Sequence, residues 1–387
     1  MFFFTEQDPN FRIKGSRDPL GFQPIWQSLG RTVVKYLSTV SNNLKDFQVL
    51  SYAWYFYGDK DPKDFLSFFL KFEQACGFAR GLYLMDDRFN GIDFVRKNLN
   101  NESFSFSTKN EHTLLSNQKS YGIYGKYNRP FTEMQIKENP DFREVMETSL
   151  KEKIDYNLLE NGIKRLLTEK VTTFTKSELK IFADCLTSIS NSEKRFYEEL
   201  ILKENNGHVQ NEVYKLFRAN PELIESRDFN LYNFINTLLT KDIPEELQSK
   251  LEYIKQAEHV LSPFVFLFRT MQAVPIWTKN TVGEATIFES FPEKLSYTFN
   301  HTVIDELNDS YNRSPYEMAL TAIKRNNVVS DNRKNAAWVK VEGDTIIICY
   351  ADGARTINEF DKDVDFEHNY FLPTYISLYK QIMQGND

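Results

Sequence analysis

Helix-start signals recur at short intervals along this chain and constrain its fold more than any other feature. Two have the capping-box form, Thr175–Glu178 and Ser190–Glu193, in which Ser or Thr precedes Glu by three residues. Each side chain then accepts a hydrogen bond from a backbone N–H that the first helical turn leaves unpaired. The others place a proline near the first turn, where its missing N–H costs little: Asp61-Pro62, Asn139-Pro140, Asn220-Pro221, Ile243-Pro244 and Ser314-Pro315. The sequence therefore predicts a mainly α protein.

Apolar spacing predicts where several of these helices run. Residues 24–37 place apolar side chains three and four apart on one face, and residues 44–57 are apolar over most of their girth. The second helix should therefore lie deep in a domain. The helix that starts at Pro62 should end near Gly77 or Gly81. The longest helix starts at Pro244, and Pro263 predicts a kink or break in it.

The remaining segments predict loops and a little β-structure. Residues 98–130 are rich in Asn, Ser, Gly and Tyr, which is typical of a loop or a short hairpin region. Residues 337–341 and 345–350 are β-rich runs on either side of Glu342-Gly343-Asp344, which predicts a hairpin. A closing helix is expected over 373–383. Helices followed by a hairpin indicate a small, winged-helix-like α+β end, although other small α+β units fit equally well.

These features favour three consecutive regions. Residues 1–130 would form an N-terminal arm and a helical domain, and 131–330 a central helical domain. Residues 331–387 would form the C-terminal hairpin and helix. A chain of 387 residues has room for two or three domains of ordinary size.

Composition limits the compartment and the partners. The net charge of −7 gives no overall attraction to nucleic acid, although local basic patches remain possible. Three distant cysteines and no CxxC pair indicate neither a disulfide framework nor a zinc site, and they favour a reducing cytoplasm. No apolar run approaches the length of a membrane span, and the N-terminus lacks the basic start of a signal peptide.

Two segments resemble known cofactor-binding motifs but lack residues that those motifs require. Gly122-Ile123-Tyr124-Gly125-Lys126 has two residues between its glycines where a phosphate loop has four. Asp361-x-Asp363-x-Asp365 resembles half of a calcium loop, but Phe366 and Leu372 stand where that loop needs Gly and Glu. His301 and Asp305 would share a helix face without an evident third ligand. We therefore expect no cofactor, and read these residues as solvated surface.

No catalytic motif stands out either. The five histidines lie outside recognisable motifs, and neither a GxSxG nor a PD-x-ExK pattern is present. A hidden active site would most plausibly be a metal-dependent nuclease whose acids meet only in the fold. Its loose candidates are Asp86, Asp87, Asp361, Asp363 and Asp365.

Nucleic-acid contact is the best supported of the weak signals. The run 119–129 contains no acid, three cations and three tyrosines, namely Lys119, Tyr121, Tyr124, Lys126, Tyr127 and Arg129. Cations neutralise phosphates, rings stack on unpaired bases, and glycines permit close approach. Two further basic patches are Arg12, Lys14, Arg17, Arg31 and Lys35, and Lys324, Arg325, Arg333, Lys334 and Lys340. The same residues also fit ordinary solvated faces and a tyrosine-rich packing loop.

The arm at 18–26 carries a second weak signal. Leu20, Phe22, Ile25 and Trp26 would make anchors for a protein partner if they are exposed. They would equally well fold back on the core.

Four sequence blocks resemble uncharacterised helical proteins of bacterial anti-phage defence islands: Arg17-Asp18-Pro19-Leu20-Gly21, Gly30-Arg31, Tyr52-Ala53-Trp54 and Gly122–Tyr127. The resemblance covers mainly residues 1–130. It implies an accessory subunit that works beside an ATPase, helicase or nuclease of the same operon, and it carries no catalytic residues with it. The leading hypothesis is thus a non-catalytic scaffold subunit that contacts DNA; the alternatives are the nuclease and a purely protein-binding scaffold.

Overall fold

The computed structural model describes residues 18–203, 209–225, 229–355, 359–361 and 363–383. Its fold is mainly α, as the sequence predicts. The chain forms two compact units, and both combine distant parts of the sequence. Unit 1 comprises residues 1–33 and 215–370, and unit 2 comprises residues 34–214 and 371–387. The boundaries expected after residues 130 and 330 fall inside helices α6 (Ile123–Glu133) and α16 (Pro315–Asn332), and neither unit matches the three consecutive regions.

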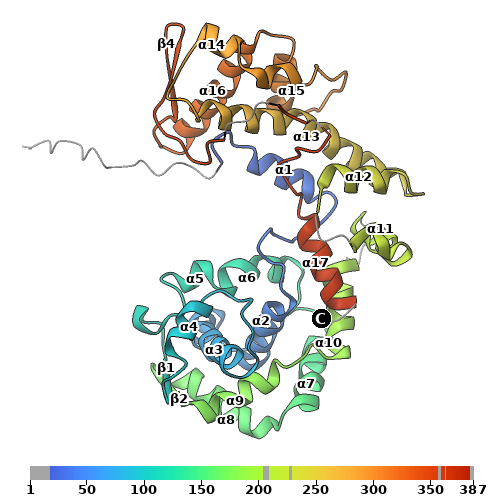
Figure 1. Cartoon of the computed structure of the whole chain (residues 1–387). Coiled ribbons are helices and arrows are strands. Elements are labelled where there is room, and N and C mark those ends of the chain that lie inside the picture. Colours follow the sequence, from blue (N-terminus) through green and yellow to red (C-terminus); the bar gives the residue numbers. More distant parts are fainter. Residues whose placement is uncertain (1–17, 204–208, 226–228, 356–358, 362, 384–387) are drawn as a thin grey trace, which may run out of the picture. The chain divides into compact units, whose positions relative to one another are not determined.

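Unit 2 is built around two buried helices, α2 (Leu44–Tyr57) and α3 (Pro62–Tyr83), with shorter helices arranged around them (Figure 1). The other helices of unit 2 are α4 (Ile92–Asn98), α5 (Gln118–Tyr121), α6 (Ile123–Glu133), α7 (Phe142–Lys153), α8 (Tyr156–Thr168), α9 (Lys176–Cys185), α10 (Asn191–Tyr197) and α17 (Leu372–Met383). A 3-10 turn (Asn110–His112) and a π-helical turn (Glu198–Lys203) complete them.

The core of unit 2 explains why α3 is longer than expected. Gly77 and Gly81 do not end the helix, because each faces a neighbour that leaves no room for a side chain. A Cβ at Gly77 would lie 2.9 Å from Leu114, and one at Gly81 would lie 2.6 Å from Val95. The rings of Trp54 and Phe65 stack at 3.5 Å and join α2 to α3.

The loop expected over 98–130 is wrong in part. Strand β1 (Ser103–Phe106) pairs antiparallel with β2 (Thr172–Thr175), some seventy residues later in the chain, and α5 and α6 follow it. Phe104 and Phe106 point inward from β1, while Ser103 is exposed. The strand therefore depends on a distant partner, which local propensity does not reveal.

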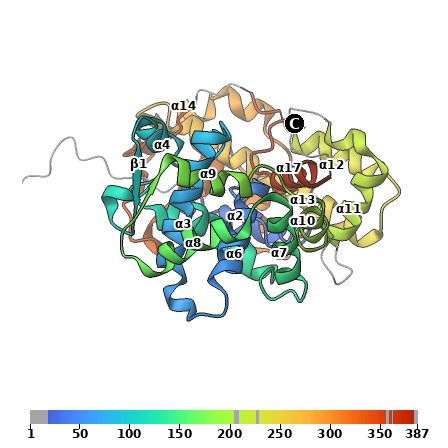
Figure 2. The ribbon, with the colours of Figure 1, turned by 90° about the horizontal axis from the view of Figure 1, so that it is seen from below.

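Unit 1 is organised around its longest helix, α13 (Glu245–Met271), which packs against α12 (Leu231–Leu239), α15 (Thr302–Ser310), α16 (Pro315–Asn332) and α1 (Gln23–Gly30). Figure 2 shows the chain from a second direction. Short segments complete unit 1: Pro221–Ile224, α14 (Lys279–Gly283) and Thr286–Ser290. Helix α11 (Val209–Ala219) contains the boundary between the units.

Pro263 does not break α13, contrary to that part of the prediction. The proline removes one helical hydrogen bond and leaves a carbonyl without its usual donor. That carbonyl is the one of His259, four residues before the proline. The buried Tyr311 hydroxyl lies 3.4 Å from it and donates to the neighbouring Val260 carbonyl at 2.9 Å, so a polar side chain meets the helix at the interruption. By contrast, the first predicted helix ends at Gly30 and not at residue 37.

The predicted hairpin is confirmed as β4 (Val339–Glu342) and β5 (Thr345–Ile348), with Gly343 at φ 60° in the turn. A third strand, β3 (Ile276–Thr278), pairs with β5 and gives the sheet order β3-β5-β4. The closing helix is also present as α17, but it belongs to unit 2, whereas the hairpin belongs to unit 1. No helix among the described residues is long and apolar enough to cross a membrane.

Candidate functional site

The aromatic–basic segment 119–129 folds as α5 and α6, so the prediction of a loop there is wrong. Gly122 separates the two helices at a point of close packing. A Cβ on this residue would lie 2.5 Å from the Gln118 carbonyl oxygen and 2.6 Å from Glu73 Oε1. The glycine therefore makes room for the protein's own carboxylate, and it does not open the backbone to a ligand.

The three tyrosines of this segment differ in exposure. Tyr127 is buried, and its hydroxyl accepts the Asn43 backbone N–H at 3.0 Å. Tyr124 packs beside the rings of Phe65 and Phe69. Tyr121 is 58% exposed, so it is the tyrosine of the three that can meet a partner.

The cations of the segment also differ. Arg129 pairs with Glu133 on its own helix at 2.8 Å. Lys119 is exposed and Lys126 is half-buried. Lys119, Tyr121 and Lys126 therefore form the part of the predicted surface without ion pairs among the described residues, and Arg129 stays exposed within its pair.

The other predicted basic patches serve the fold in part. Arg17, like Arg12 and Lys14, lies outside the described residues, and Arg31 is half-buried where α1 ends. Two cations, one in α16 and one directly after it, form hydrogen bonds with the N-terminal arm. Arg325 Nε donates to the Leu20 carbonyl at 2.8 Å, and Arg333 donates to the Asp18 carbonyl at 2.7 Å and pairs with its carboxylate at 3.1 Å.

The remaining lysines of these patches lie at the surface, whereas the apolar side chains of the arm are buried. Lys334 and Lys340 are exposed, and Lys324 pairs with Glu306. The apolar arm residues Leu20, Phe22 and Ile25 are buried, so they fold back on unit 1, which was the alternative to a partner surface.

Lys126 lies in a polar groove beside the start of α2, in which two small cavities adjoin. One cavity, of about 260 Å³, is lined by Lys126 and Arg88, and the other, of about 240 Å³, is lined by Arg88 and Lys45. Both are also lined by Asn42 and Asn43. We call this surface the Arg88–Lys126 groove.

The acids around the groove are already neutralised. Asp46 pairs with the buried Arg80 at 2.7 Å. Asp86 pairs with Arg80 at 3.0 Å and with Lys45 at 3.4 Å. Burial alone would raise the pKa of Asp86, but Arg80 and its other partners hold that pKa below the ordinary value.

The two cations that name the groove have no such partner in the part of the chain that the structure describes. Asp87, which is exposed, lies 3.6 Å from Arg96. Among the described residues, neither Arg88 nor Lys126 forms an ion pair. The groove therefore presents two positive charges that are free to meet an anion.

Tyr121 is connected to the same surface. Asn90 lines the groove, and its side-chain amide donates to the Tyr121 carbonyl at 2.8 Å. Asn43 is fixed too, since it caps α2 through Lys45 N–H and donates to the Arg88 carbonyl at 3.1 Å. These hydrogen bonds fix the backbone on both sides of Arg88.

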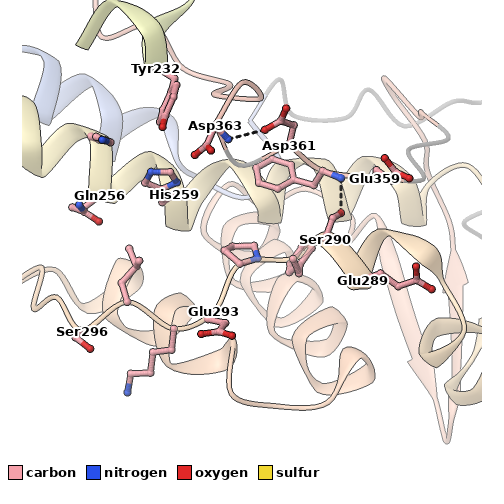
Figure 3. Close-up of a pocket in the computed structure, with 16 residues that line it drawn as sticks. Tyr232, Gln256, His259, Glu289, Ser290, Glu293, Ser296, Glu359, Asp361 and Asp363 are labelled. Carbon is pink, nitrogen blue, oxygen red and sulfur yellow. Dashed lines mark hydrogen bonds between the residues drawn. The ribbon is translucent and has the colours of Figure 1, made fainter. Parts of the chain in front are cut away.

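A wide cavity in unit 1, about 1060 Å³, has more acids than lysines along its border, and the acids include Glu289, Glu293 and Glu359 (Figure 3). Asp361 and Asp363 of the incomplete calcium motif lie at its edge. The carboxylates of Asp361 and Asp365 accept hydrogen bonds from the backbone of the same loop. Asp361 accepts the backbone N–H of Asp363, and the backbone N–H of Asp361 donates to Asp365, both at 3.0 Å. This is the acidic surface loop that the sequence favours.

The candidate nuclease acids are divided between the units. Asp86 and Asp87 belong to unit 2, and Asp361, Asp363 and Asp365 belong to unit 1. Within the described ranges, no three His, Cys, Asp or Glu side chains form a group that could hold a metal ion. Asp305, which was paired with His301 by spacing, accepts the backbone N–H groups of Phe299 and His301 at the start of α15.

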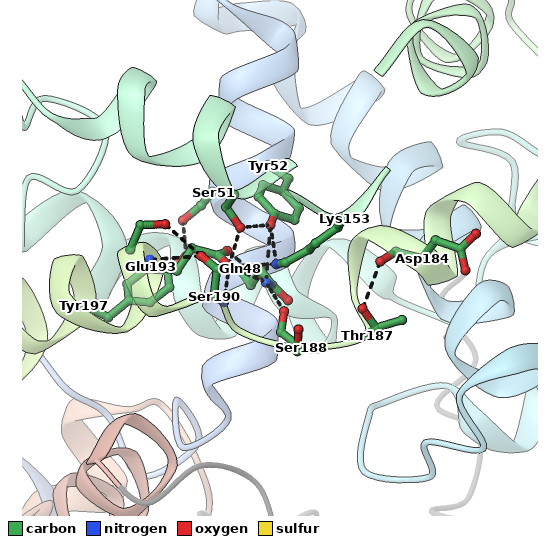
Figure 4. A network of polar contacts seen from close by, with 12 residues as sticks. Gln48, Ser51, Tyr52, Lys153, Asp184, Thr187, Ser188, Ser190, Glu193 and Tyr197 are labelled. Atoms are coloured by element: carbon green, nitrogen blue, oxygen red, sulfur yellow. Dashed lines mark hydrogen bonds and ion pairs between the residues drawn. The ribbon is translucent and has the colours of Figure 1, made fainter. Parts of the chain in front are cut away.

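A second polar cluster in unit 2 is sealed inside the protein (Figure 4). Lys153 lies 2.8 Å from Glu193 and donates to Tyr52 at 2.9 Å, and Ser149 donates to Glu193 at 2.6 Å. The Lys153 and Glu193 side chains are 6% and 0% exposed. A buried, hydrogen-bonded ion pair without solvent access ties α2, α7 and α10 together, and it offers no place for a substrate.

Comparison of the chain with protein-family models, curated proteins and solved structures gave no match. The candidate site therefore depends on its own geometry. Sequence reasoning named Lys126 but missed Arg88, because 38 positions separate them and no motif connects them. The signal that was available is modest: Arg88 follows Asp86 and Asp87 in a short connection between helices.

Proposed function

We propose that the chain is a non-catalytic recognition subunit of a larger bacterial assembly and that it contacts single-stranded nucleic acid through the Arg88–Lys126 groove. The observation that supports the contact is the pair of cations without ion-pair partners in the described chain, in a groove whose acids are each paired. Phosphate is the anion that nucleic acid supplies at regular spacing.

The surroundings of the groove favour an unpaired strand over a duplex. The half-exposed ring of Tyr121 lies on the segment that Asn90 ties to the groove. An aromatic ring stacks on a base only where that base is not already stacked within a duplex. The exposed amide of Asn42 adds a hydrogen-bonding group that suits phosphate or base oxygens.

Fluorescence anisotropy with a labelled 20-nucleotide single strand tests the contact. In the double variant Arg88→Ala/Lys126→Ala, affinity should fall, and the slope of log K against log salt should become shallower by about 1.4, which corresponds to two lost phosphate contacts. Tyr121→Ala should weaken the single strand by about 1–3 kcal/mol and leave a duplex of the same sequence unaffected.

A matched control is Lys164→Ala/Lys170→Ala, which removes two exposed cations of unit 2 away from the groove. The control should bind like the unchanged protein. If both double variants lose affinity equally, net charge alone drives binding and the groove is not the site. Absence of any binding at 50 mM salt would reject the nucleic-acid role.

The assembly part of the proposal is supported by the sequence resemblance alone and needs its own test. Affinity purification of the tagged chain from its native operon, with and without nuclease treatment, should recover an ATPase, helicase or nuclease in stoichiometric amount. Recovery of the chain alone would reject it. Mg²⁺-dependent cleavage of the same oligonucleotide by the purified chain, abolished by EDTA, would show instead that the protein is an enzyme.

A further inference from the structure

Unit 1 contains a cavity of about 470 Å³ that no part of the proposed contact uses. Its apolar wall includes Phe22, Phe268 and Trp338, which are almost fully buried, and Trp26. The volume is in the range typical of small-molecule sites, and such sites combine apolar walls with a few polar groups.

His368 is one of the polar residues that line this cavity, and its imidazole contacts a buried carboxylate. Its Nδ1 lies 2.7 Å from Glu258 Oε1, and its ring stacks on Trp26 with a centroid separation of 5.7 Å. Glu258 is fully buried, and the hydroxyls of Tyr370 and Ser262 donate to it at 2.6 and 2.5 Å. These contacts fix both the position and the rotation of the imidazole.

The hydrogen bonds also determine which nitrogen is available. Burial would raise the pKa of Glu258, but His368, Ser262 and Tyr370 together keep it below its ordinary value, so the carboxylate is ionised. An ionised carboxylate only accepts, and Nδ1 must therefore be the donor. Nε2 then becomes the acceptor of the neutral ring, and it has no hydrogen-bond partner among the described residues.

The backbone beside this histidine is strained. Tyr370 has φ 52°, in the left-handed region that non-glycine residues rarely adopt. Its hydroxyl donates to Glu258, so the unusual backbone places a side chain that fixes the carboxylate. Strain of this kind is found where surrounding contacts determine a site.

The charges at the rim exclude one class of ligand. Arg269 is occupied in a two-bond pair with Glu367, and Asp18 is paired with Arg333. Asp352 is exposed and forms no ion pair within the described ranges. The uncompensated charge at the rim is therefore negative, which disfavours a phosphate or carboxylate group on the ligand.

We infer that this cavity binds an uncharged aromatic heterocycle of nucleoside size, with its ring against the aromatic wall and an N–H or O–H group donating to His368 Nε2. The cavity is a second site, independent of the nucleic-acid groove. Nucleosides are suitable probes, because each pairs a flat ring with hydroxyl and N–H donors and has a charged counterpart, the 5′-monophosphate, for comparison.

Isothermal titration calorimetry with adenosine, guanosine, cytidine and uridine tests the inference. We expect at least one nucleoside to bind, with its 5′-monophosphate at least fivefold weaker. His368→Ala should weaken the nucleoside at least tenfold. The control His112→Ala changes a histidine of unit 2 and should leave binding unchanged.

Circular dichroism of both variants establishes that they are folded. His368→Asn provides a second, smaller change, in which a polar side chain is retained but the acceptor is displaced; it should also lose affinity. No binding by any of the four nucleosides at 5 mM, unchanged binding in His368→Ala, or tighter binding of the monophosphate would each overturn the inference.

Crossing the two sets of variants separates the sites. Nucleoside binding should survive Arg88→Ala/Lys126→Ala, and oligonucleotide binding should survive His368→Ala. If the groove variant abolished nucleoside binding, the heterocycle would belong to the groove and the cavity inference would fail while the proposed function stood.

Discussion

Glu73 in unit 2 and Glu258 in unit 1 are both fully buried, and both accept several hydrogen bonds, yet their pKa values move in opposite directions. Glu73 accepts the Ile123 N–H at 2.6 Å and the Gln118 amide at 2.7 Å, and burial still raises its pKa to about 7. Glu258 has an imidazole against it, and its pKa is lowered. Hydrogen bonds from neutral donors therefore do not offset the pKa rise that burial causes at Glu73. At Glu258 the neighbouring imidazole, which can carry positive charge, does offset it.

Glu193 is a third buried glutamate, and its comparison with Glu258 shows that burial alone does not identify a candidate site. Like Glu258, Glu193 has a nitrogen-bearing side chain against it, but Lys153 and Glu193 are buried in the packed interior of unit 2, whereas His368 lines a cavity. Access to a cavity, and not burial of charge, distinguishes a candidate site from a structural ion pair.

The largest effect is expected where a buried charge loses its partner. Lys153→Met keeps much of the packing but leaves the buried Glu193 carboxyl group without its ion-pair partner, which should cost about 3–5 kcal/mol of unfolding free energy. The control is Lys151→Met, two residues earlier on α7, where the exposed pair with Glu147 should cost about 0.5 kcal/mol. Equal losses in urea denaturation would show that the sealed pair has no special role.

The second effect concerns the raised pKa of Glu73. The folded pKa of about 7 exceeds the ordinary value of 4.5, so the unfolded chain ionises first and stability falls as pH rises between these values. Glu73→Gln removes this dependence. Between pH 4.5 and 8 the unchanged protein should lose about 3 kcal/mol relative to the variant. Parallel stability curves for the two proteins over this range would contradict the assignment.

The third effect measures how closely Glu73 approaches α6. Gly122→Ala would place a Cβ within 2.6 Å of Glu73 Oε1 and 2.5 Å of a backbone oxygen, so we expect a loss of about 1–3 kcal/mol. Gly283→Ala is the control, because no atom lies within 4 Å of its Cβ position and alanine favours helix. Thermal unfolding that ranks the two variants in the reverse order would show that Gly122 is not a packing glycine.

The sequence predicted what depends on neighbouring residues and missed what depends on distant ones. Helix α2 has the predicted bounds, and both capping boxes form, because spacing and caps are local properties. The β1–β2 pairing was missed, since each four-residue strand exists only against the other. Gly122 was read as a point of close approach for a ligand, because its packing partner, Glu73, lies 49 positions earlier in the chain.

The residues of the groove and of the cavity also divide into those that the local sequence reveals and those that only the fold brings together. Lys119, Tyr121 and Lys126 could be selected from one acid-free run, whereas Arg88 joins Lys126 only in the folded unit. Glu258 and His368 are 110 positions apart, and His368 follows an acidic stretch that resembles a surface loop. A histidine becomes recognisable as part of a site once its carboxylate and its cavity are known.

The smallest effect has the opposite pH dependence to that of Glu73 and completes the comparison. Glu258 has a lowered pKa, so its ionised form contributes stability above the ordinary value of 4.5, and this contribution is lost as pH falls through the folded pKa. Glu258→Gln should therefore cost about 1–2 kcal/mol at pH 7, since a hydrogen bond to a charged group is replaced by a neutral one. The cost should shrink as the pH falls below the ordinary value of 4.5 and the unchanged protein also approaches the neutral form. Urea denaturation at pH 7 and at pH 3.5 measures it. If the cost instead grows as pH falls, the charge of Glu258 does not stabilise unit 1, and burial determines the behaviour of both glutamates.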